Sequence, residues 1–344
     1  MRYRLQRHDG TDCSATMVPI TVLRMVPIQR YRHNKYDYTM NDLAQYTKQI
    51  NVVLDYINTH IDEKLDIQLL AHQTNLSVYH FHRIFTSVMG EPLAKYIMRK
   101  RLEQAAIQLQ NDLQKPVTNI ALEYGFNSVN VFCRNFKKHF GITAETYRNK
   151  IRQKDSKNRT LEHIISQQSR SYSHYFCQRK TLKIGDKFMI CNFEIKHLSA
   201  IHVVYCRHYG TYTTMQKSFE KLLHWAYPKG LVTTEEFHLA SIYHDDPNIT
   251  TEEKRISDAC LIVKNPVKTD GEISAYTIPA GQYAVGHFEI LWDEFQTSWE
   301  CMFRLIDEHG CRCCGLPFEV YLNNHETHPE KKWIVDICIP VVSK

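Results

Sequence analysis

One carboxylate in the second half of the chain stands among aromatic residues and could bind a cation. Glu319 lies in the segment PFEVYLNN, whose alternating residues predict a strand. Because side chains alternate across a strand, Glu319 shares its face with Tyr321. A carboxylate that faces an apolar, aromatic cleft needs a counter-charge, and an organic cation supplies one together with cation–π attraction. The alternative is the solvated face of an antiparallel sheet, on which Glu319 needs no partner.

Aromatic residues that could line such a cleft are spread over the same half of the chain. With Glu319 and Tyr321 at the centre, the first choices for its walls are Tyr205, Tyr209, Tyr283 and Trp292, and the further candidates are Tyr212, Tyr243 and Trp299. The same carboxylate suits a general base, so a small-molecule hydrolase that uses Glu319 stays open beside stoichiometric ligand binding. A domain that binds a protein partner is a third possibility.

Two arginines in the first half of the chain hold matching positions after a serine that can cap a helix. Arg83 is the seventh residue counted from Ser77, and Arg134 is the seventh counted from Ser128. Arginine contacts guanine in the DNA major groove through two hydrogen bonds. A single exposed arginine is usually only solvated, but two at equivalent positions favour DNA readout. The residues that we expect to contact DNA are Tyr79, His82, Arg83, Val129, Asn130, Arg134, Lys137 and Lys138.

Other clusters carry weaker signals. Cys311, Cys313 and Cys314 in GCRCCG lie near His309, but they lack the paired Cys-x-x-Cys spacing of common zinc sites. The histidines of HETHPEKK fit an exposed loop. The chain has no glycine-rich phosphate loop and no serine-hydrolase elbow. We therefore expect no metal, no cofactor and no enzymatic activity.

The elements that must position the two arginines follow a helical period. Apolar residues recur every three or four positions over 41–57, and shorter helices fit 67–73 and 117–124. Ser77 and Ser128 each begin a helix, which Gly90 and Gly141 end. A long helix over about 93–110 joins these two groups, and Thr143 can cap a last one to about Lys150. The two serines lie 51 residues apart, each after a short helix and a turn, as in helix-turn-helix units.

The second half of the chain changes to a strand period. The expected helices are 213–227 and 292–308, and the expected strands are 193–198, 201–205, 239–244, 259–263, 272–278, 283–289, 319–322 and 333–340. A strand followed by a helix and two strands occurs twice, about 80 residues apart. Such an internal duplication predicts a pseudo-symmetric α+β domain with a cleft at the seam between its halves.

The charge of the chain is unevenly distributed. Residues 1–40 hold 7 basic and 3 acidic residues, residues 41–154 hold 15 and 10, and residues 155–344 hold 21 and 24. A basic first half suits nucleic-acid binding. There is no apolar run long enough to cross a membrane and no signal peptide, and the 11 cysteines fit reduced thiols, so we expect a cytoplasmic protein that does not bind membranes.

Residues 65–148 resemble the AraC/XylS family of transcription regulators. The matching features are the patterns IAxxxGF and SxxxFxRxFKxxFG and a closing YR, within VTNIALEYGFNSVNVFCRNFKKHFGITAETYR. The resemblance implies two helix-turn-helix units that enter successive major grooves on one face of DNA, and RNA polymerase as a further partner. Val129 and Val131 stand where many members carry polar residues, so we expect the second unit to read mainly methyl groups and shape.

Residues 193–342 are similar to the GyrI-like, effector-binding domain found at the C-terminus of some AraC-type and MerR-type regulators. The supporting segments include HYGTYTTMQKSFEKLLHWA, IPAGQYAVGHFEILWDEF and PFEVYLNN. The resemblance implies the duplicated strand-helix-strand-strand fold and a small-molecule pocket between its halves. The fold class expected for the chain is therefore an all-α double helix-turn-helix domain followed by an α+β domain.

The expected organisation is a basic, flexible extension over 1–40, a DNA-binding domain over 41–150, a linker over 151–190 and an effector-binding domain over 191–344. Translation from Met40 stays open as an alternative start. The whole chain is interpreted as a sequence-specific transcription regulator that binds double-stranded DNA and responds to a small-molecule effector, with an amphipathic cation as the favoured class.

Overall fold

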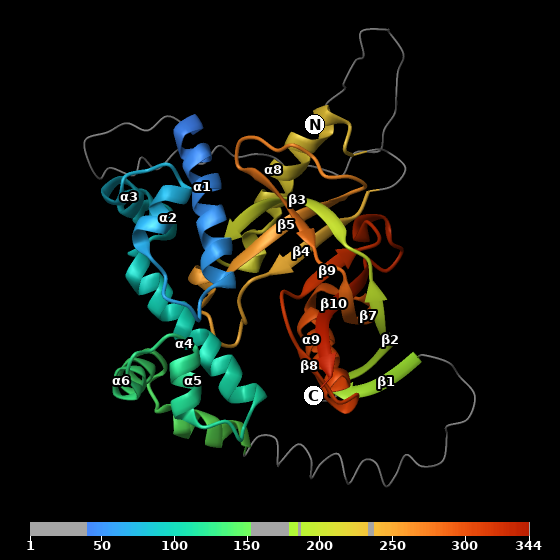
Figure 1. Ribbon diagram of the computed structural model, residues 1–344. Helices are drawn as coiled ribbons and strands as arrows, with labels where there is room; N and C mark the ends of the chain where they lie inside the picture. Colours follow the sequence, from blue (N-terminus) through green and yellow to red (C-terminus); the bar gives the residue numbers. More distant parts are fainter. Residues whose placement is uncertain (1–39, 153–178, 185–186, 233–236, 344) are drawn as a thin grey trace.

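The computed structural model describes residues 40–152, 179–184, 187–232 and 237–343 (Figure 1). The predicted extension over 1–39 and residues 153–178 of the predicted linker lie outside the described residues. None of the described helices is both long enough and apolar enough to cross a membrane.

The first half of the chain is helical, with six helices followed by helical residues 144–152: α1 (Met40–Thr59), α2 (Ile67–Gln73), α3 (Val78–Met89), α4 (Leu93–Asn111), α5 (Val117–Glu123) and α6 (Val129–Phe140). The Ser77 hydroxyl accepts a hydrogen bond from the His80 N–H at 3.3 Å, so the predicted cap of α3 is confirmed. Ser128 begins α6 but forms no such side-chain hydrogen bond, so the predicted serine cap of α6 is wrong.

Helix α4 belongs to two apolar cores and thereby joins two helix-turn-helix units. Its first turns pack with α1–α3 around Phe81 and Phe85, and its last turns pack with α5 and α6 around Phe132 and Phe136. These four phenylalanines are fully buried, so they form the inward faces of α3 and α6. In Figure 1 the two units lie at the two ends of α4, on the side of the molecule away from the large sheet.

The second half of the chain forms one ten-stranded sheet among the described residues, with helices α8 (Gln216–Ala226) and α9 (Phe295–Glu308). The strands are β1 (Arg179–Ile184), β2 (Lys187–Leu198), β3 (Ile201–Tyr209), β4 (Leu239–Tyr243), β5 (Ile256–Val263), β6 (Ile273–Ile278), β7 (Gly281–Ile290), β8 (Cys311–Cys313), β9 (Phe318–Tyr321) and β10 (Trp333–Ser343). All paired strands are antiparallel.

The strand order confirms the internal duplication. The sheet runs β1-β2-β7-β10-β9-β4-β5-β3-β6, so the pair β9–β4 lies at its middle. Moving outward from that pair, one meets β10, β7 and β2 on one side and β5, β3 and β6 on the other. The two repeats are β3-α8-β4-β5 and β7-α9-β9-β10, and they meet along the β9–β4 seam.

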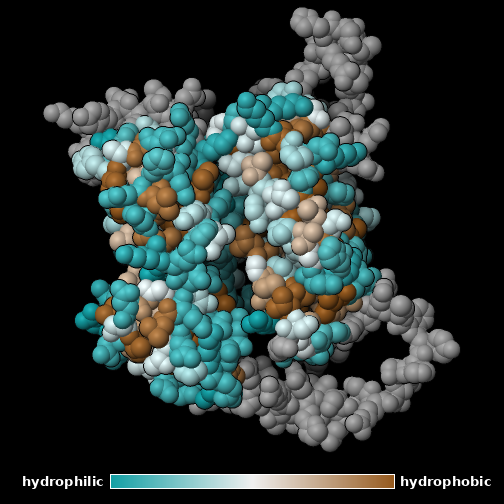
Figure 2. Space-filling view, in the orientation of Figure 1, coloured by the Kyte–Doolittle hydropathy of each residue, from teal (hydrophilic) through white to brown (hydrophobic). Residues whose placement is uncertain are grey.

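The two faces of this sheet have different neighbours. Helix α8 covers β3 and β5 on one face around Leu222 and Leu261, and α9 covers β7 and β10 on the same face around Leu305 and Ile337. The opposite face carries a separate apolar core, and its β3–β5 side lies against α1 and α4 of the helical half (Figure 1). Figure 2 shows apolar patches scattered among polar residues on both halves.

Several strands and strand boundaries differ from the sequence prediction. Strand β1 and the beginning of β2 fall within the predicted linker over 151–190, where the polar composition typical of an edge strand resembles a loop. Strand β3 continues past Tyr205 to Tyr209, and β5 begins at Ile256 rather than Ala259. The short strand β8 lies in the predicted cysteine loop and pairs with the end of β10.

Candidate functional site

Glu319 lies at the seam between the two repeats. On β9 it is paired in register with Ser241 of β4, and only 1% of its surface is exposed. Strand alternation turns its side chain to the face covered by α8 and α9, whereas its neighbour Phe318 packs in the core of the opposite face. The predicted position of Glu319 beside Tyr321 is confirmed, because the Tyr321 hydroxyl donates a hydrogen bond to this carboxylate.

Three neutral donors hold the Glu319 carboxylate. The hydroxyls of Tyr243 and Tyr321 donate to Oε2 at 2.8 and 2.7 Å, and the indole N–H of Trp299 donates to Oε1 at 2.6 Å. The Tyr321 hydroxyl also forms a hydrogen bond of 2.8 Å with the Ser241 hydroxyl. These donors come from β4, β9 and α9, so both repeats contribute to one site.

The Glu319 carboxylate, when ionised, has no positively charged partner in this cluster. Burial raises the pKa of Glu319, although the three donors act in the opposite direction. Burial also raises the pKa values of Tyr243 and Tyr321 well above the usual range, so both hydroxyls stay protonated and remain donors. Among the described residues, no basic side chain forms an ion pair with Glu319.

Aromatic rings surround these donors and extend to the surface. Tyr243 lies edge-on against both Tyr212 and Trp299, with ring centroids 5.2 and 5.6 Å apart. Trp299 in turn lies 6.0 Å from Phe303, which is exposed. The ring of Phe219, on α8 of the other repeat, lies edge-on to the ring of Tyr321, with their centroids 6.2 Å apart. Sequence reasoning missed Phe219 and Phe303, although Phe303 follows Trp299 by one helical turn on α9.

Four of the predicted walls do not line this cluster, and those predictions were wrong. Tyr205 and Tyr209 point from the opposite face of β3 toward α1, where their hydroxyls donate to Asp55 at 3.3 Å and Asn51 at 2.6 Å. Tyr283 also lies in the core of that opposite face and donates to the Pro279 carbonyl. Trp292 lies in a surface turn and is 63% exposed. Three further candidates do belong to the cluster: Tyr212, Tyr243 and Trp299.

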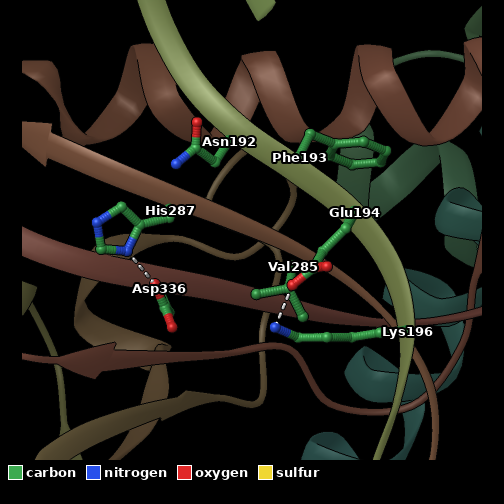
Figure 3. A pocket seen from close by; sticks show the side chains of 7 residues that line it. All are labelled: Asn192, Phe193, Glu194, Lys196, Val285, His287 and Asp336. Carbon is green, nitrogen blue, oxygen red and sulfur yellow. Dashed lines mark hydrogen bonds and ion pairs between the residues drawn. The ribbon is translucent and has the colours of Figure 1, made fainter. Parts of the chain in front are cut away.

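A shallow hollow of about 220 Å³ lies elsewhere on the sheet (Figure 3). Its charged side chains are already paired, Lys196 with Glu194 and His287 with Asp336 at 2.7 Å. The remaining lining residues are Asn192, Phe193 and Val285. Because it is polar and its charges are satisfied, this hollow does not offer the aromatic, anionic environment of Glu319.

The predicted DNA-contacting residues lie on α3 and α6. Tyr79 is 78% exposed, and His82 and Arg83 are half-buried beside it. On α6 the exposed residues are Asn130, Val131, Cys133, Arg134, Lys137, Lys138 and His139. Val129 differs from the prediction because its side chain is half-buried and packs against the core of the second unit. Figure 1 shows α3 and α6 on one side of the molecule, as two reading helices require.

Arg101 of α4 fixes the spacing of the two units. Its guanidinium donates to the carbonyls of Ile61 and Glu63 in the first unit, at 3.0 and 2.6 Å, and to that of Gly125 in the second, at 2.8 Å. Gly125 has a φ of +71°, and a Cβ there would lie 2.7 Å from the guanidinium. The sequence pattern indicated a turn before Ser128, but not this contact.

The cysteine cluster on and after β8 has no feature of a metal site. Cys311, Cys313 and Cys314 form no disulfide. Within the part of the chain that the structure describes, no group of three or more histidine, cysteine, aspartate or glutamate side chains is placed to hold a metal ion.

Comparisons with known proteins agree with this division of the chain. The GyrI-like small molecule binding domain matches residues 192–342, and a helix-turn-helix domain matches residues 70–150. The regulatory protein SoxS of Salmonella typhimurium is 31% identical over 102 residues, which are 30% of this chain and 94% of SoxS. The right origin-binding protein of Escherichia coli is 34% identical over 99 residues, which are 29% of this chain and 34% of that protein.

Among solved structures, the C-terminal domain of EcmrR aligns over 45% of this chain and all of that domain, with a TM-score of 0.41 and 18% sequence identity.

Proposed function

Since this chain belongs to the AraC family of helix-turn-helix transcription regulators, we propose that α3 and α6 read a DNA site and that an amphipathic cation bound at Glu319 is its effector. The chain is a DNA-binding transcription regulator that joins its reading helices to a GyrI-like small-molecule-binding domain. The proposal adds the chemical class of the effector and the residues that contact each partner.

The observation that carries the effector proposal is the buried Glu319 carboxylate without a counter-charge. A cation that reaches it gains Coulomb attraction in a low-dielectric site, and the surrounding rings add cation–π attraction. Glu319 is covered in this structure, so the ligand must displace one of its donors. Trp299 is the donor next to exposed Phe303, which makes the α9 side the natural entrance.

We expect the affinity for a cation to depend on pH. Because burial raises the pKa of Glu319 above its ordinary value of 4.5, a larger fraction of the protein holds a neutral Glu319 at a given acidic pH than an exposed glutamate would. A cation selects the ionised form, so its affinity should increase as the pH rises through the raised pKa, and binding below that point should release a proton. Calorimetry in buffers of different ionisation enthalpy measures both effects. An affinity for the cation that is constant across the acidic range would contradict the role of Glu319.

The DNA proposal assigns base contacts to α3 and backbone contacts to the last turn of α6. Arg83 and Tyr79 present a guanidinium and a ring beside His82, all on the outward side of α3. Lys137 and Lys138 lie exposed at the end of α6, where they can reach phosphates. Asn130, Val131 and Arg134 face the second major groove. Val129 packs against the core of the second unit and holds the helix in place.

For Arg83→Ala we expect weaker binding, by about 1–3 kcal/mol, to the duplex that the wild-type chain selects from a random pool, and relaxed base preference at one position. Lys137→Ala is the matched control: it should weaken all sequences alike and reduce the slope of log affinity against log salt by about one. Titrations at several salt concentrations separate the two. Unchanged preference in Arg83→Ala would remove α3 from base readout.

The proposal also includes contact with RNA polymerase and excludes catalysis. A regulator bound beside a promoter acts on transcription through the polymerase, so pull-down of polymerase with the DNA-bound chain tests that contact.

Glu319 already accepts hydrogen bonds from three donors, which favours ligand binding over a role as a general base. Multiple turnovers of a bound ester or amide would favour the hydrolase alternative.

A further inference from the structure

The chain between β4 and β5 connects the Glu319 cluster to both reading units. This segment, residues 244–256, is here called the brace. It follows Tyr243 directly, and Tyr243 donates its hydroxyl hydrogen to Glu319. A second link runs through Tyr212, whose ring lies against Tyr243 on one side and 5.3 Å from the guanidinium of Arg255 on the other. A ligand that displaces Trp299 removes the ring packed against Tyr243, and it therefore acts on the brace at both of its ends.

The apolar side chains of the brace enter both cores of the helical half. Ile249 packs with the core of the second unit, around Leu102 and Phe132. Ile256 packs with the core of the first unit, around Ile50 and Tyr96. One segment of the effector-binding half is thus buried in both helix-turn-helix units, on either side of their shared helix α4.

Buried charges hold the brace against α4. The Lys100 ammonium donates to Asp245 at 2.6 Å, and the side chains of Lys100 and Asp245 are only 3% and 1% exposed. The other carboxylate oxygen of Asp245 accepts the N–H of Ile256 at 2.7 Å. Lys254 binds Glu91 at 2.6 Å, and Glu91 binds Arg99 of α4 at 2.7 Å. Charges buried this deeply tolerate few alternative geometries, because an unpaired charge in such a position is costly.

Resting on the proposed function, we propose that the brace is the surface through which the effector-binding half sets the relative position of the two reading units, and that a cation at Glu319 changes DNA affinity by moving it. The positioning residues are Lys100 and Asp245, which are buried outside both the predicted DNA-contacting residues and the Glu319 cluster. Coupling between two sites is reciprocal, so DNA must change cation affinity by the same factor as the cation changes DNA affinity.

The experiment measures this factor in the full chain. The probes are trimethyl(phenylbutyl)ammonium and the duplex that the wild-type chain selects from a random pool. Cation affinity is determined by calorimetry with and without saturating duplex. We expect the duplex to change the wild-type affinity, in either direction, by about 5- to 150-fold, which is the usual range of coupling between sites.

The double variant Lys100→Met with Asp245→Asn tests the brace itself. Both substitutions preserve shape and remove the charge pair together, and the amide oxygen introduced by Asp245→Asn can still accept the Ile256 N–H. We expect its coupling factor to fall below about twofold, while each probe alone binds within about threefold of the wild-type affinity. The matched control Lys221→Met with Glu272→Gln removes an exposed pair of 2.7 Å on the same half and should keep full coupling.

The possible failures are distinguishable. If the wild-type chain binds no cation, the proposed effector class is wrong, and the proposal that a cation at Glu319 moves the brace is wrong with it. If the cation binds and the duplex leaves its affinity unchanged, the proposed function stands in part, and the brace proposal is overturned. Full coupling in the Lys100→Met, Asp245→Asn variant would also overturn it, because the ion pair between the brace and α4 would then not be needed for the coupling between cation and DNA.

Discussion

Glu319→Gln should reduce the affinity for trimethyl(phenylbutyl)ammonium by about 2–5 kcal/mol, which is thirtyfold or more. The substitution keeps the size of the side chain and removes its charge. A cation loses its counter-ion, whereas the aromatic shell of Tyr243, Trp299 and Tyr321 stays in place. The matched neutral compound, in which carbon replaces the ammonium nitrogen, uses only that shell, so its affinity should change little. Calorimetry of both compounds against wild type and variant gives the comparison.

A control separates a local loss of charge from a general one. Asp336→Asn removes a carboxylate from neighbouring strand β10, at a site that is paired with His287 and lies on the opposite face. This variant should bind both compounds as the wild type does. Equal losses for the charged and the neutral compound in Glu319→Gln would refute the cation proposal and favour a ligand recognised by shape, or a protein partner.

Local pattern was sufficient to predict most elements of this chain, though not strands β1 and β8, and the centre of its candidate site. Helix and strand periods predicted the reading helices and the duplicated fold, and alternation on β9 predicted that Glu319 and Tyr321 share a face. The same alternation could not show which face of β3 looks toward Glu319. Because a shift of one residue exchanges the two faces of a strand, Tyr205 and Tyr209 were assigned to the wrong side.

The contact between the two halves has no signal in local pattern. Lys100 and Asp245 are separated by 145 positions, and a single lysine or aspartate in a sequence usually indicates an exposed residue. Their pairing also qualifies the charge argument, since part of the positive charge of the first half neutralises carboxylates of the second. Lys100 and Lys254 thus join the two halves, and Lys100 is buried in its pair with Asp245.

A buried charge cluster around Asp258 stabilises this contact region. Asp258 of β5 accepts hydrogen bonds from Arg207 Nε at 2.8 Å and Nη2 at 3.0 Å, and it contacts His244 Nε2 at 2.6 Å. Burial would raise the pKa of Asp258, but the charges of Arg207 and His244 outweigh it and hold the pKa well below the usual range. A lowered carboxyl pKa stabilises the folded state above the ordinary value of 3.8, and this contribution is lost as the pH falls through the folded-state pKa.

Asp258→Ala should therefore lower the free energy of unfolding by about 3–5 kcal/mol at neutral pH, because among the described residues it leaves the half-exposed Asp55 as the one carboxylate paired with the buried Arg207. His287 and Asp336 form a more exposed pair, so Asp336→Ala should cost less than about 1 kcal/mol. Urea unfolding of the full chain measures both. The double variant Arg207→Met with Asp258→Ala removes both charges and should recover part of the loss, since an apolar pair no longer buries an unpaired guanidinium. The single variant Arg207→Met completes the comparison. If the double variant were as unstable as the sum of Arg207→Met and Asp258→Ala, the cost would lie in packing, and the Arg207–Asp258 charge pair would not be what holds β3 and β5 against α1.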